Sequence, residues 1–421
     1  MNTQIPNRRN GVYLLLILCL LAGLFTGRTF FFNIAYLFTG LMALAYVWAW
    51  LAVRWIGISR RTRTRRAQVG RTVSETFTVR NLSIIPKLWL EVRDQSNLPN
   101  HRASHIVAWM GGRKTYRWNV ETVCIARGQY RLGPISVISG DPFGFYISPR
   151  LIAATSSLIV YPQTVPIDKF ELPAGLLSGG EAQRQRSHNV TTNAAGVRDY
   201  AYGDSFNRIH WRSTARKDKL VVKEFEIDPL VDIWIFPDFS AGALIETEGL
   251  QRTEPNGYIL PSQPGIPPST EEYTVVVAAS LAEYFVNLER AVGFASYAPS
   301  REVHQPERGK RQITHIFETL AVARSLSSYS LAQMLRLETP YLTRGTTLIL
   351  ITSSLDPQWV TEAEIMSRRG MRPMCVFIDP ATFVNGINSQ EIRDQMRISR
   401  IPHIIIRHGE NLSSALSQRP N

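Results

Sequence analysis

The sequence predicts a chain of three parts: a hairpin of two transmembrane helices, a small antiparallel β-sandwich, and a C-terminal α/β (Rossmann-type) domain. Three observations support this fold class. A long apolar run opens the chain, short β-rich runs broken by Asn, Pro and Gly follow it, and strands then alternate with helices. A length of 421 residues allows two or three domains with at least one sizeable core.

The apolar run supplies the two transmembrane helices. Arg28 is the only charged residue between Gly11 and Val53, and it divides the run into two spans. The second span is long enough for a hydrocarbon core that needs about 20 residues, and the first is near the lower limit. Tryptophans mark one interface: Trp48, Trp50 and Trp55. A cleaved signal peptide is the alternative, but no A-x-A site follows the first span.

Arginines set the expected orientation. They precede the first span and cluster after the second, at Arg8, Arg9, Arg54, Arg60, Arg61, Arg63, Arg65 and Arg66. The positive-inside rule then places both termini and the body in the cytoplasm, with the chain in the inner membrane as a multi-pass protein. We expect the cluster at 60–66 to lie against anionic headgroups. It absorbs part of the net charge of +13, so the basic balance does not indicate nucleic acid.

Composition shifts give the domain boundaries. We expect the N-terminus, both helices and a basic juxtamembrane stretch in 1–66, the sandwich in 67–165, a linker with a distinctive segment in 166–230, and the α/β domain in 231–421. In the last part, apolar strand-like runs such as VDIWIFPD and TTLILITS alternate with helical patterns, which favours a largely parallel sheet. A Pro- and Gly-rich stretch at about 246–270 is predicted to be a mobile insertion.

The most distinctive segment is Gly196 to Glu226, which combines many basic and acidic residues with His210 and Trp211. Here the chain resembles the bacterial family known as domain of unknown function 58. The residues that carry the resemblance include Gly196, Arg198, Tyr200, Gly203, Asp204, Arg208, Ile209, His210, Trp211, Thr214, Ala215, Arg216, Leu220, Val222, Lys223, Glu224 and Glu226. The apolar spans, RGQYRLGP and DPFGFY extend it over nearly the whole chain.

The resemblance implies a membrane-tethered protein whose C-terminal domain is von Willebrand factor A-like. Many members of the family are encoded beside MoxR-type AAA+ ATPases. The resemblance therefore implies an ATPase-partnered role in assembling or remodelling other proteins. The partners we expect are the membrane and a protein, either a MoxR-type ATPase or envelope proteins, and not nucleic acid.

Three interpretations of the segment stay open. It can be a structural network with Trp211 buried and its carboxylates paired with arginines. It can be a docking surface that uses exposed Arg and Trp. It can also be a hydrolase site in which Asp204 and His210 act with Ser213 or Thr214, although the spacing specifies no such geometry. The candidate residues are Arg198, Tyr200, Gly203, Asp204, Arg208, His210, Trp211, Arg216, Lys223, Glu224 and Glu226.

The resemblance also implies a place for a metal. A von Willebrand A-type domain binds Mg²⁺ through D-x-S-x-S, and this chain has Asp238, Ser240 and then Gly242. Thr314 is the expected loop threonine, and Ser353 stands where a later Asp is required, with Asp356 three residues on. Because a side-chain ligand and a charge are missing, we expect no cofactor and weak or no Mg²⁺ binding.

The predicted function is a non-enzymatic, membrane-anchored adaptor or scaffold for protein–protein interaction that works in protein complex assembly or envelope maintenance. The sequence has no G-x-x-x-x-G-K-[ST], H-E-x-x-H or G-x-S-x-G motif. We therefore predict no catalytic residues. The alternatives are the hydrolase described above and a metal-dependent ligand-binding A-type domain.

Overall fold

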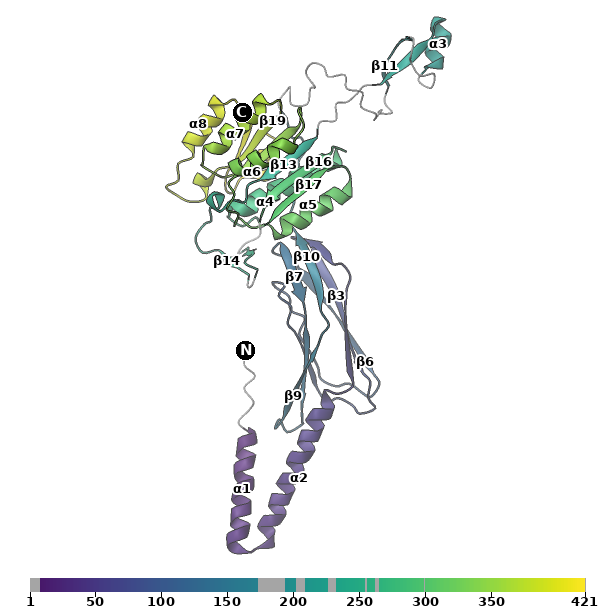
Figure 1. Ribbon diagram of the computed structural model, residues 1–421. Coiled ribbons are helices and arrows are strands. Elements are labelled where there is room, and N and C mark those ends of the chain that lie inside the picture. Colours follow the sequence, from purple (N-terminus) through teal and green to yellow (C-terminus); the bar gives the residue numbers. More distant parts are fainter. Residues whose placement is uncertain are drawn as a thin grey trace. The chain divides into compact units, whose positions relative to one another are not determined.

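Two apolar helices precede the sandwich (Figure 1). Helix α1 (Arg8–Thr26) and helix α2 (Thr29–Ala52) form a hairpin that turns at Gly27 and Arg28. Gly27 has a φ of +65°, a left-handed conformation that glycine adopts without strain. Both helices are long and apolar enough to cross a membrane, judged by length and composition. The two predicted apolar helices are thus confirmed as helices.

The computed structural model describes residues 8–172, 194–201, 209–225, 232–253, 256–261, 265–298 and 300–420. The chain divides into two compact units. Unit 1 comprises Met1–Gln163 and Leu250–Gly265, and unit 2 comprises Thr164–Gly249 and Ile266–Asn421. The segment Leu250–Gly265 therefore belongs to unit 1, although both of its neighbours in the sequence belong to unit 2. We describe each unit by itself.

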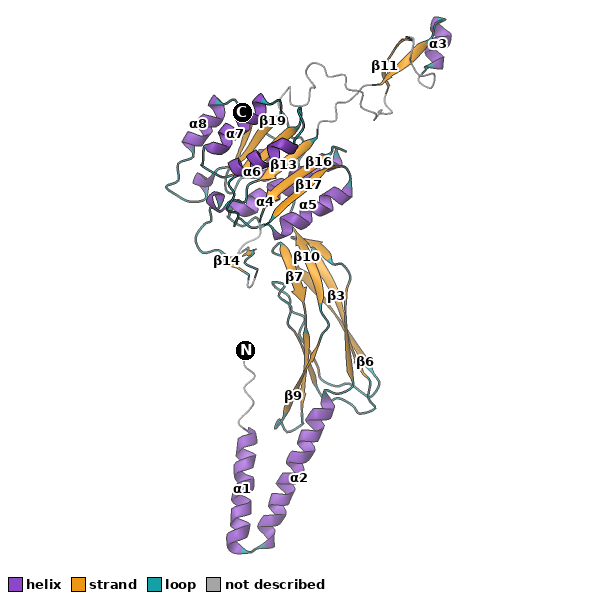
Figure 2. Cartoon of the chain, viewed as in Figure 1, coloured by secondary structure: helices purple, strands orange, loops and turns teal. Residues whose placement is uncertain are grey.

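Unit 1 contains the predicted sandwich (Figure 2). Its strands are β1 (Ile56–Thr62), β2 (Arg66–Gln68), β3 (Thr72–Asn81), β4 (Leu90–Asp94), β5 (His105–Val107), β6 (Thr115–Val123), β7 (Gly128–Leu132), β8 (Ile135–Gly140), β9 (Ile147–Ile152) and β10 (Ser156–Tyr161). They form sheets with the orders β1-β3-β6, β5-β4-β8-β9 and β2-β10-β7. Every neighbouring pair is antiparallel except β2 and β10.

The sandwich begins earlier than expected, and this corrects the prediction for the arginine cluster. Strand β1 pairs with β3 from Ile56 onward, so the cluster at 60–66 lies on and between strands β1 and β2. The side chain of Arg60 is only 3% exposed and sits in an ion-pair network inside the sandwich. Arg60 therefore does not lie against lipid headgroups. The expectation failed because a strand that carries the consecutive arginines Arg60 and Arg61 near its end has the composition of a basic tail.

Two apolar clusters make up the interior of the sandwich. One lies between sheet β1-β3-β6 and sheet β5-β4-β8-β9, and includes Phe77, Leu90 and Val137. The other lies against sheet β2-β10-β7 and includes Tyr130 and Leu158. β-Branched and aromatic side chains alternate along these strands, as a sheet with one buried face requires.

The insertion is ordered where the structure describes it, which corrects the expectation of a mobile loop. Strands β14 (Gln251–Arg252) and β15 (Ile259–Leu260) form an antiparallel hairpin that belongs to unit 1. Tyr258 joins the second apolar cluster, and the Asn256 side-chain amide donates to the Gln129 carbonyl over 2.9 Å. Gly128 has a φ of +145° and lies under the Tyr258 ring, where a Cβ atom would collide with it. A residue without a side chain is required there.

The expected linker contains a second hairpin. Strands β11 (Ala194–Asp199) and β12 (Val221–Phe225) are antiparallel, and helix α3 (Trp211–Lys217) lies between them in sequence. The most distinctive stretch of the sequence is therefore a hairpin with a short helix. The strand-like alternation of residues in LVVKEF was the local signal for β12.

Unit 2 contains a six-stranded sheet with the order β17-β16-β13-β18-β19-β20. The strands are β13 (Ile233–Pro237), β16 (Val292–Tyr297), β17 (Arg301–Glu307), β18 (Thr347–Thr352), β19 (Arg372–Ile378) and β20 (His403–Ile406). All pairs are parallel except β16 with β17. The helices are α4 (Thr270–Asn287), α5 (Lys310–Val322), α6 (Leu331–Glu338), α7 (Gln358–Arg368), α8 (Gln390–Ile398) and α9 (Leu412–Leu416), with 3-10 turns at η2 (Ala241–Ala243), η3 (Thr339–Tyr341) and η4 (Pro380–Thr382).

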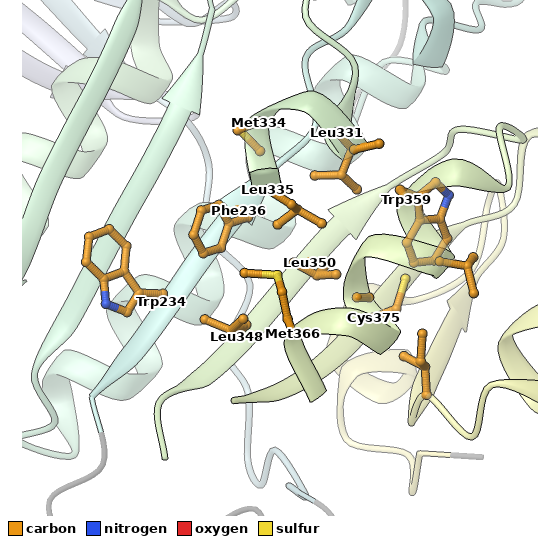
Figure 3. Close-up of a cluster of buried hydrophobic side chains, with 14 of the residues drawn as sticks. Trp234, Phe236, Leu331, Met334, Leu335, Leu348, Leu350, Trp359, Met366 and Cys375 are labelled. Carbon is orange, nitrogen blue, oxygen red and sulfur yellow. The ribbon is translucent and has the colours of Figure 1, made fainter. Parts of the chain in front are cut away.

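The predicted mixed α/β arrangement is confirmed, and the buried strands explain it. Strands β13, β16 and β18 are buried at every residue, as strands covered on both faces must be. Figure 3 shows side chains from the sheet packing against side chains from α6 and α7, among them Phe236, Leu335 and Trp359. Strand β17 was not predicted, because it is a polar, mostly exposed edge strand.

Candidate functional site

The candidate site lies at the carboxyl ends of strands β13 and β18. In sequence order the sheet reads 3-2-1-4-5-6, so the chain reverses its direction of winding between these two neighbours. In doubly wound sheets, ligands bind outside the carboxyl ends of the strands at this switch point. Asp238 follows β13 and Ser353 follows β18, so both lie at this edge.

Asp238 is buried and fully engaged by its neighbours. Its Oδ1 accepts a hydrogen bond from the Ser240 backbone N–H over 2.9 Å, and its Oδ2 accepts one from the Thr352 hydroxyl over 2.6 Å. Burial raises the pKa of Asp238, and these hydrogen bonds only partly oppose the effect. Through these two hydrogen bonds, Asp238 links the loop after β13 to the end of β18.

Serines line a pocket of about 330 Å³ above Asp238. They come from three segments, and they are Ser240, Ser327, Ser328, Ser330, Ser353 and Ser354. The segment between α5 and α6 is tied to the loop after β13, because the Ser327 N–H donates to the Phe239 carbonyl and the Ala241 N–H donates to the Ser327 carbonyl. Ser330 begins α6 with a capping box to Gln333. The result is a rigid, hydroxyl-rich depression.

The donor set does not fit Mg²⁺. Both oxygens of Asp238 accept protein hydrogen bonds, the Ser353 hydroxyl donates to the Ala243 carbonyl, and Gly242 has no side-chain oxygen. Asp356 also lines the pocket, but its Oδ1 accepts the Gln358 N–H at the start of α7. In the parts of the chain that the structure describes, no three His, Cys, Asp or Glu side chains gather where they could hold a metal ion.

The structure brings together Asp238, Ser240 and Asp356 but not Thr314. Thr314 lies in the second turn of α5, where its hydroxyl donates to the Lys310 carbonyl. Because β17 is antiparallel, Glu307 pairs with Val292 at the start of β16, and α5 begins at the amino edge of the sheet. Thr314 is therefore at the wrong end. Ser327 and Ser328 occupy the loop position that was assigned to it.

A second depression, of about 460 Å³, adjoins the first and shares Ser327 with it. It is lined mainly by aromatic and apolar side chains: Tyr297, Ser300, Arg301, Ser327, Tyr329, Leu337 and Tyr341. Several of these expose a large part of their surface, and Leu326, next to Ser327, is 66% exposed. Polar depressions beside exposed aromatic side chains are typical of protein-binding surfaces.

A buried carboxylate holds this second depression in shape. Glu338 is 2% exposed, and it accepts two hydrogen bonds from Arg301, at 2.8 and 3.0 Å, and one from the Tyr297 hydroxyl at 2.7 Å. Burial and the hydrogen bond to Glu338 raise the pKa of Tyr297, so it stays a neutral donor. We call the two depressions together the sheet-edge site.

The distinctive segment is placed differently. Trp211 is 66% exposed, which contradicts the interpretation that buries it in a structural network. His210 caps helix α3, because its Nδ1 accepts the Ser213 N–H over 3.2 Å and lies 2.7 Å from the Ser213 hydroxyl. Tyr200 pairs through its backbone with Leu220, and Arg216 is exposed on α3.

Several predicted residues of this segment cannot be placed. Gly203, Asp204, Arg208 and Glu226 lie outside the described residues. For Arg198, Lys223 and Glu224 the structure describes only the backbone, in β11 and β12. The hydrolase alternative stays a prediction, because His210 lies 2.7 Å from the Ser213 hydroxyl while Asp204 is outside the described residues.

Sequence reasoning missed most of the sheet-edge site. The run Ser325 to Ser330, with four serines and a tyrosine, was an available signal, because a polar run of this kind marks a loop. Nothing local connects it with Asp238 or Ser353. Tyr297 and Glu338 carried no signal at all, since each looks like an ordinary strand or helix residue.

The fold and these sites define a protein with an apolar helix hairpin, a β-sandwich and a mixed α/β domain. The model of the family described as "Protein of unknown function DUF58" matches residues 196–255. The chain therefore carries the DUF58 family segment, which confirms the resemblance found in its sequence. The chain is also 22% identical over 300 residues to "Uncharacterized protein YeaD" of Bacillus subtilis (strain 168). That match covers 68% of this chain and 66% of the relative, just under two thirds of its length.

Solved structures add only weak likeness. A pilus adhesin, SpaC from Lactobacillus rhamnosus GG, is similar with a TM-score of 0.32 and 13% identity, over 44% of this chain and 29% of that one. The CARDB domain of a Pyrococcus furiosus protein is similar with a TM-score of 0.20 and 16% identity, over 25% of this chain and 91% of that domain. Neither likeness is strong enough to carry an argument.

Proposed function

We propose that this protein is a membrane-anchored, non-enzymatic adaptor whose α/β domain binds a protein partner at the sheet-edge site. The observation that carries the proposal is the pairing of the two depressions at the switch point of the sheet. Hydroxyls and aromatic side chains converge there, and exposed apolar side chains surround them. This composition suits a protein surface better than a metal or a small charged substrate.

The anchor in this proposal is the hairpin of α1 and α2. With Arg8 and Arg9 at the start of the first helix, Arg54 after the second and only Arg28 between the two helices, the positive-inside rule favours a cytoplasmic body on an inner membrane. A reporter fused after Asn421 should then be active only in its cytoplasmic form. Activity of a periplasmic reporter at that position would overturn the orientation.

The partner in this proposal is a MoxR-type AAA+ ATPase, which the family resemblance implies. A von Willebrand factor A-like domain is the finer fold class that belongs to the same proposal, and the sheet order is compatible with it. The exposed Trp211 and Arg216 on helix α3 offer a second contact surface.

Binding can be measured with the full chain in lipid nanodiscs and the purified ATPase of the same organism. Leu326→Asp places a charge next to Ser327 of the sheet-edge site and should weaken binding at least about tenfold, since an unpaired charge buried on binding costs more than about 1.4 kcal/mol. Ile398→Asp is the matched control, because Ile398 is an exposed apolar residue on α8. Equal losses in both variants, or no binding by the unmodified chain, would reject the proposal.

A further inference from the structure

Exposed apolar side chains gather at one end of the sandwich, in the loops beside helix α2. They follow α2 directly or lie in the β3–β4, β5–β6 and β8–β9 connections, and they are Trp55, Leu82, Ile84, Ile85, Trp109 and Phe143. Ile84 is 75% exposed and Trp109 is 60% exposed. Single exposed apolar residues are normal, but a group of them at one place marks an interaction surface. We call this group the apolar rim.

Hydrogen bonds hold the rim against the end of α2. The Leu82 N–H donates to the Trp55 carbonyl over 2.7 Å, and the Lys87 ammonium donates to the Leu51 carbonyl in the last turn of α2 over 2.6 Å. The β3–β4 loop is tied in turn to the β5–β6 loop, because the Arg113 N–H donates to the Ser83 carbonyl over 2.9 Å. The loops therefore keep a fixed position beside the helix.

The β8–β9 turn reaches back along the helices (Figure 1). The Tyr146 ring meets the Tyr46 ring of α2 edge-on at 5.5 Å, and the Tyr146 hydroxyl lies 3.1 Å from the Tyr13 hydroxyl of α1. Tyr46 precedes the last residue of α2, Ala52, by six positions, which is about 9 Å along a helix. If α2 crosses a bilayer, this turn and Phe143 lie at the depth of its interface rather than above it.

The backbone of this turn is suited to that depth. Asp141 is buried, and its carboxylate accepts the N–H groups of Phe143 at 2.9 Å and Tyr146 at 2.6 Å. The Gly144 N–H donates to the Asp141 carbonyl over 3.2 Å. Polar backbone groups must find partners within the protein where water is scarce, and here the N–H groups of Phe143, Gly144 and Tyr146 do so.

The exposed charged side chains around the apolar rim are all basic. Exposed basic residues follow α2 or lie at the same ends of β3 and β6: Arg54, Arg80, Arg113 and Lys114. Asp141 is the only carboxylate within residues 53–57, 80–87, 108–117 and 141–147, and it is buried. Apolar tips surrounded by basic side chains match the two layers of a membrane surface, acyl chains below and anionic headgroups above.

We propose that the apolar rim is a lipid-binding surface that inserts into the bilayer interface beside α2. This proposal rests on the membrane anchor proposed above and goes beyond it. The anchor concerns only the two helices, whereas the rim makes the end of the sandwich itself a part of the membrane contact. The sandwich would then keep a fixed distance from the bilayer, because its own loops as well as the two helices contact the lipid.

The test uses the full chain in nanodiscs of phosphatidylcholine and phosphatidylglycerol, labelled at one introduced cysteine with an environment-sensitive fluorophore. The native cysteines, Cys19, Cys124 and Cys375, are buried. Labels at W109C and F143C report on the rim. A label at V123C is the matched control, because Val123 is exposed at the opposite end of β6, about 26 Å from its start at a strand rise of about 3.3 Å per residue. A label at L37C, exposed in the middle of α2, reports on the anchor.

Nitroxide-bearing lipids should quench the labels at 109 and 143 severalfold more than the label at 123, and both rim labels should shift their emission to the blue. Quenching at 37 with none at 109 and 143 beyond the level at 123 would refute the rim and leave the anchor standing. No quenching at 37 would refute the anchor and the rim with it. A blue shift at 109 that occurs in native membranes but not in lipid-only nanodiscs would assign the rim to a protein partner and overturn the lipid proposal.

Discussion

Arg60→Met is a substitution from which we expect a large loss of stability in unit 1. Arg60 is buried over the Phe77 ring, where its Nη2 lies 2.5 Å from Asp94 Oδ1 and its Nε lies 3.5 Å from Glu75 Oε1. His101 faces the same two carboxylates at 3.0 and 3.2 Å. All four side chains are at most 3% exposed. The Arg60 guanidinium therefore lies beside two buried carboxyl groups, and the His101 ring contacts the same two groups.

The magnitude follows from that burial. Methionine keeps the apolar stem of Arg60 but removes the guanidinium from beside the two buried carboxyl groups. Removing one partner from a buried ion pair costs about 3–5 kcal/mol, because the remaining charge has neither water nor a counter-ion. Amide exchange in strand β3, followed by mass spectrometry, reports the opening of unit 1 alone. It should become roughly 10²- to 10⁴-fold faster, since each 1.4 kcal/mol is a factor of ten.

Arg61→Met is the control, because Arg61 is the next residue of β1 and projects from the opposite, exposed face. It should change stability by no more than about 0.5 kcal/mol. If the two variants exchange at the same rate, the ion pairs of Arg60 do not stabilise the sandwich, and the reasoning fails.

The pH dependence gives a second readout. Burial alone would raise the pKa of Asp94, but hydrogen bonds from His101 and Ser96 and the charge of Arg60 outweigh it, so the folded pKa lies below its ordinary value. A carboxyl with a depressed folded pKa contributes stability above its unfolded pKa, about 3.9 for Asp, and loses it as the pH falls through the folded value. Arg60→Met removes one of the depressing groups. The Asp94 contribution should therefore be smaller in this variant, and its loss on acidification should be complete at a higher pH than in Arg61→Met.

Three further predictions concern other parts of the chain. Tyr258→Ala should destabilise unit 1 by about 3–5 kcal/mol in urea unfolding, because it empties an aromatic site in the second apolar cluster over Gly128, and a loss under 1 kcal/mol would contradict the docking of the hairpin. Calorimetric titration of the full chain with Mg²⁺ should give the same flat trace as Asp238→Ala, whereas binding tighter than about 100 μM, roughly 5.5 kcal/mol, that disappears in the variant would restore a metal site. Glu338→Gln should cost about 1.5–3 kcal/mol, since it weakens charged hydrogen bonds to Arg301 and Tyr297, and an unchanged melting curve would show that this carboxylate does not hold the site.

The sequence by itself determined the order of the parts. An apolar run interrupted at Arg28, strands broken by turn residues, and buried strands such as Ile233–Pro237 that alternate with helices are all local patterns. Hydrophobic periodicity is written into neighbouring residues, so it survives without knowledge of the fold. The family segment was equally available, because its match lies in one continuous stretch.

The sites were less accessible, and Thr314 shows why. Its assignment assumed that helix α5 starts at the same edge of the sheet as the loops after β13 and β18. A polar edge strand, β17, reversed the chain once more and carried α5 to the other edge. Because this strand was not predicted, Thr314 was assigned to the site, whereas Ser327 and Ser328 line it.

Only the tertiary structure decided which charged residues meet. Arg60 stands in a run of exposed-looking arginines, and neither Glu75 nor Asp94 nor His101 is its neighbour in sequence. Strand register places Thr62 opposite Glu75, and the packing of one sheet on another brings Asp94 and His101 to the same point. The energy of such a cluster comes from removing its charges from water together, and that depends on distances across the fold, which no local pattern of residues encodes.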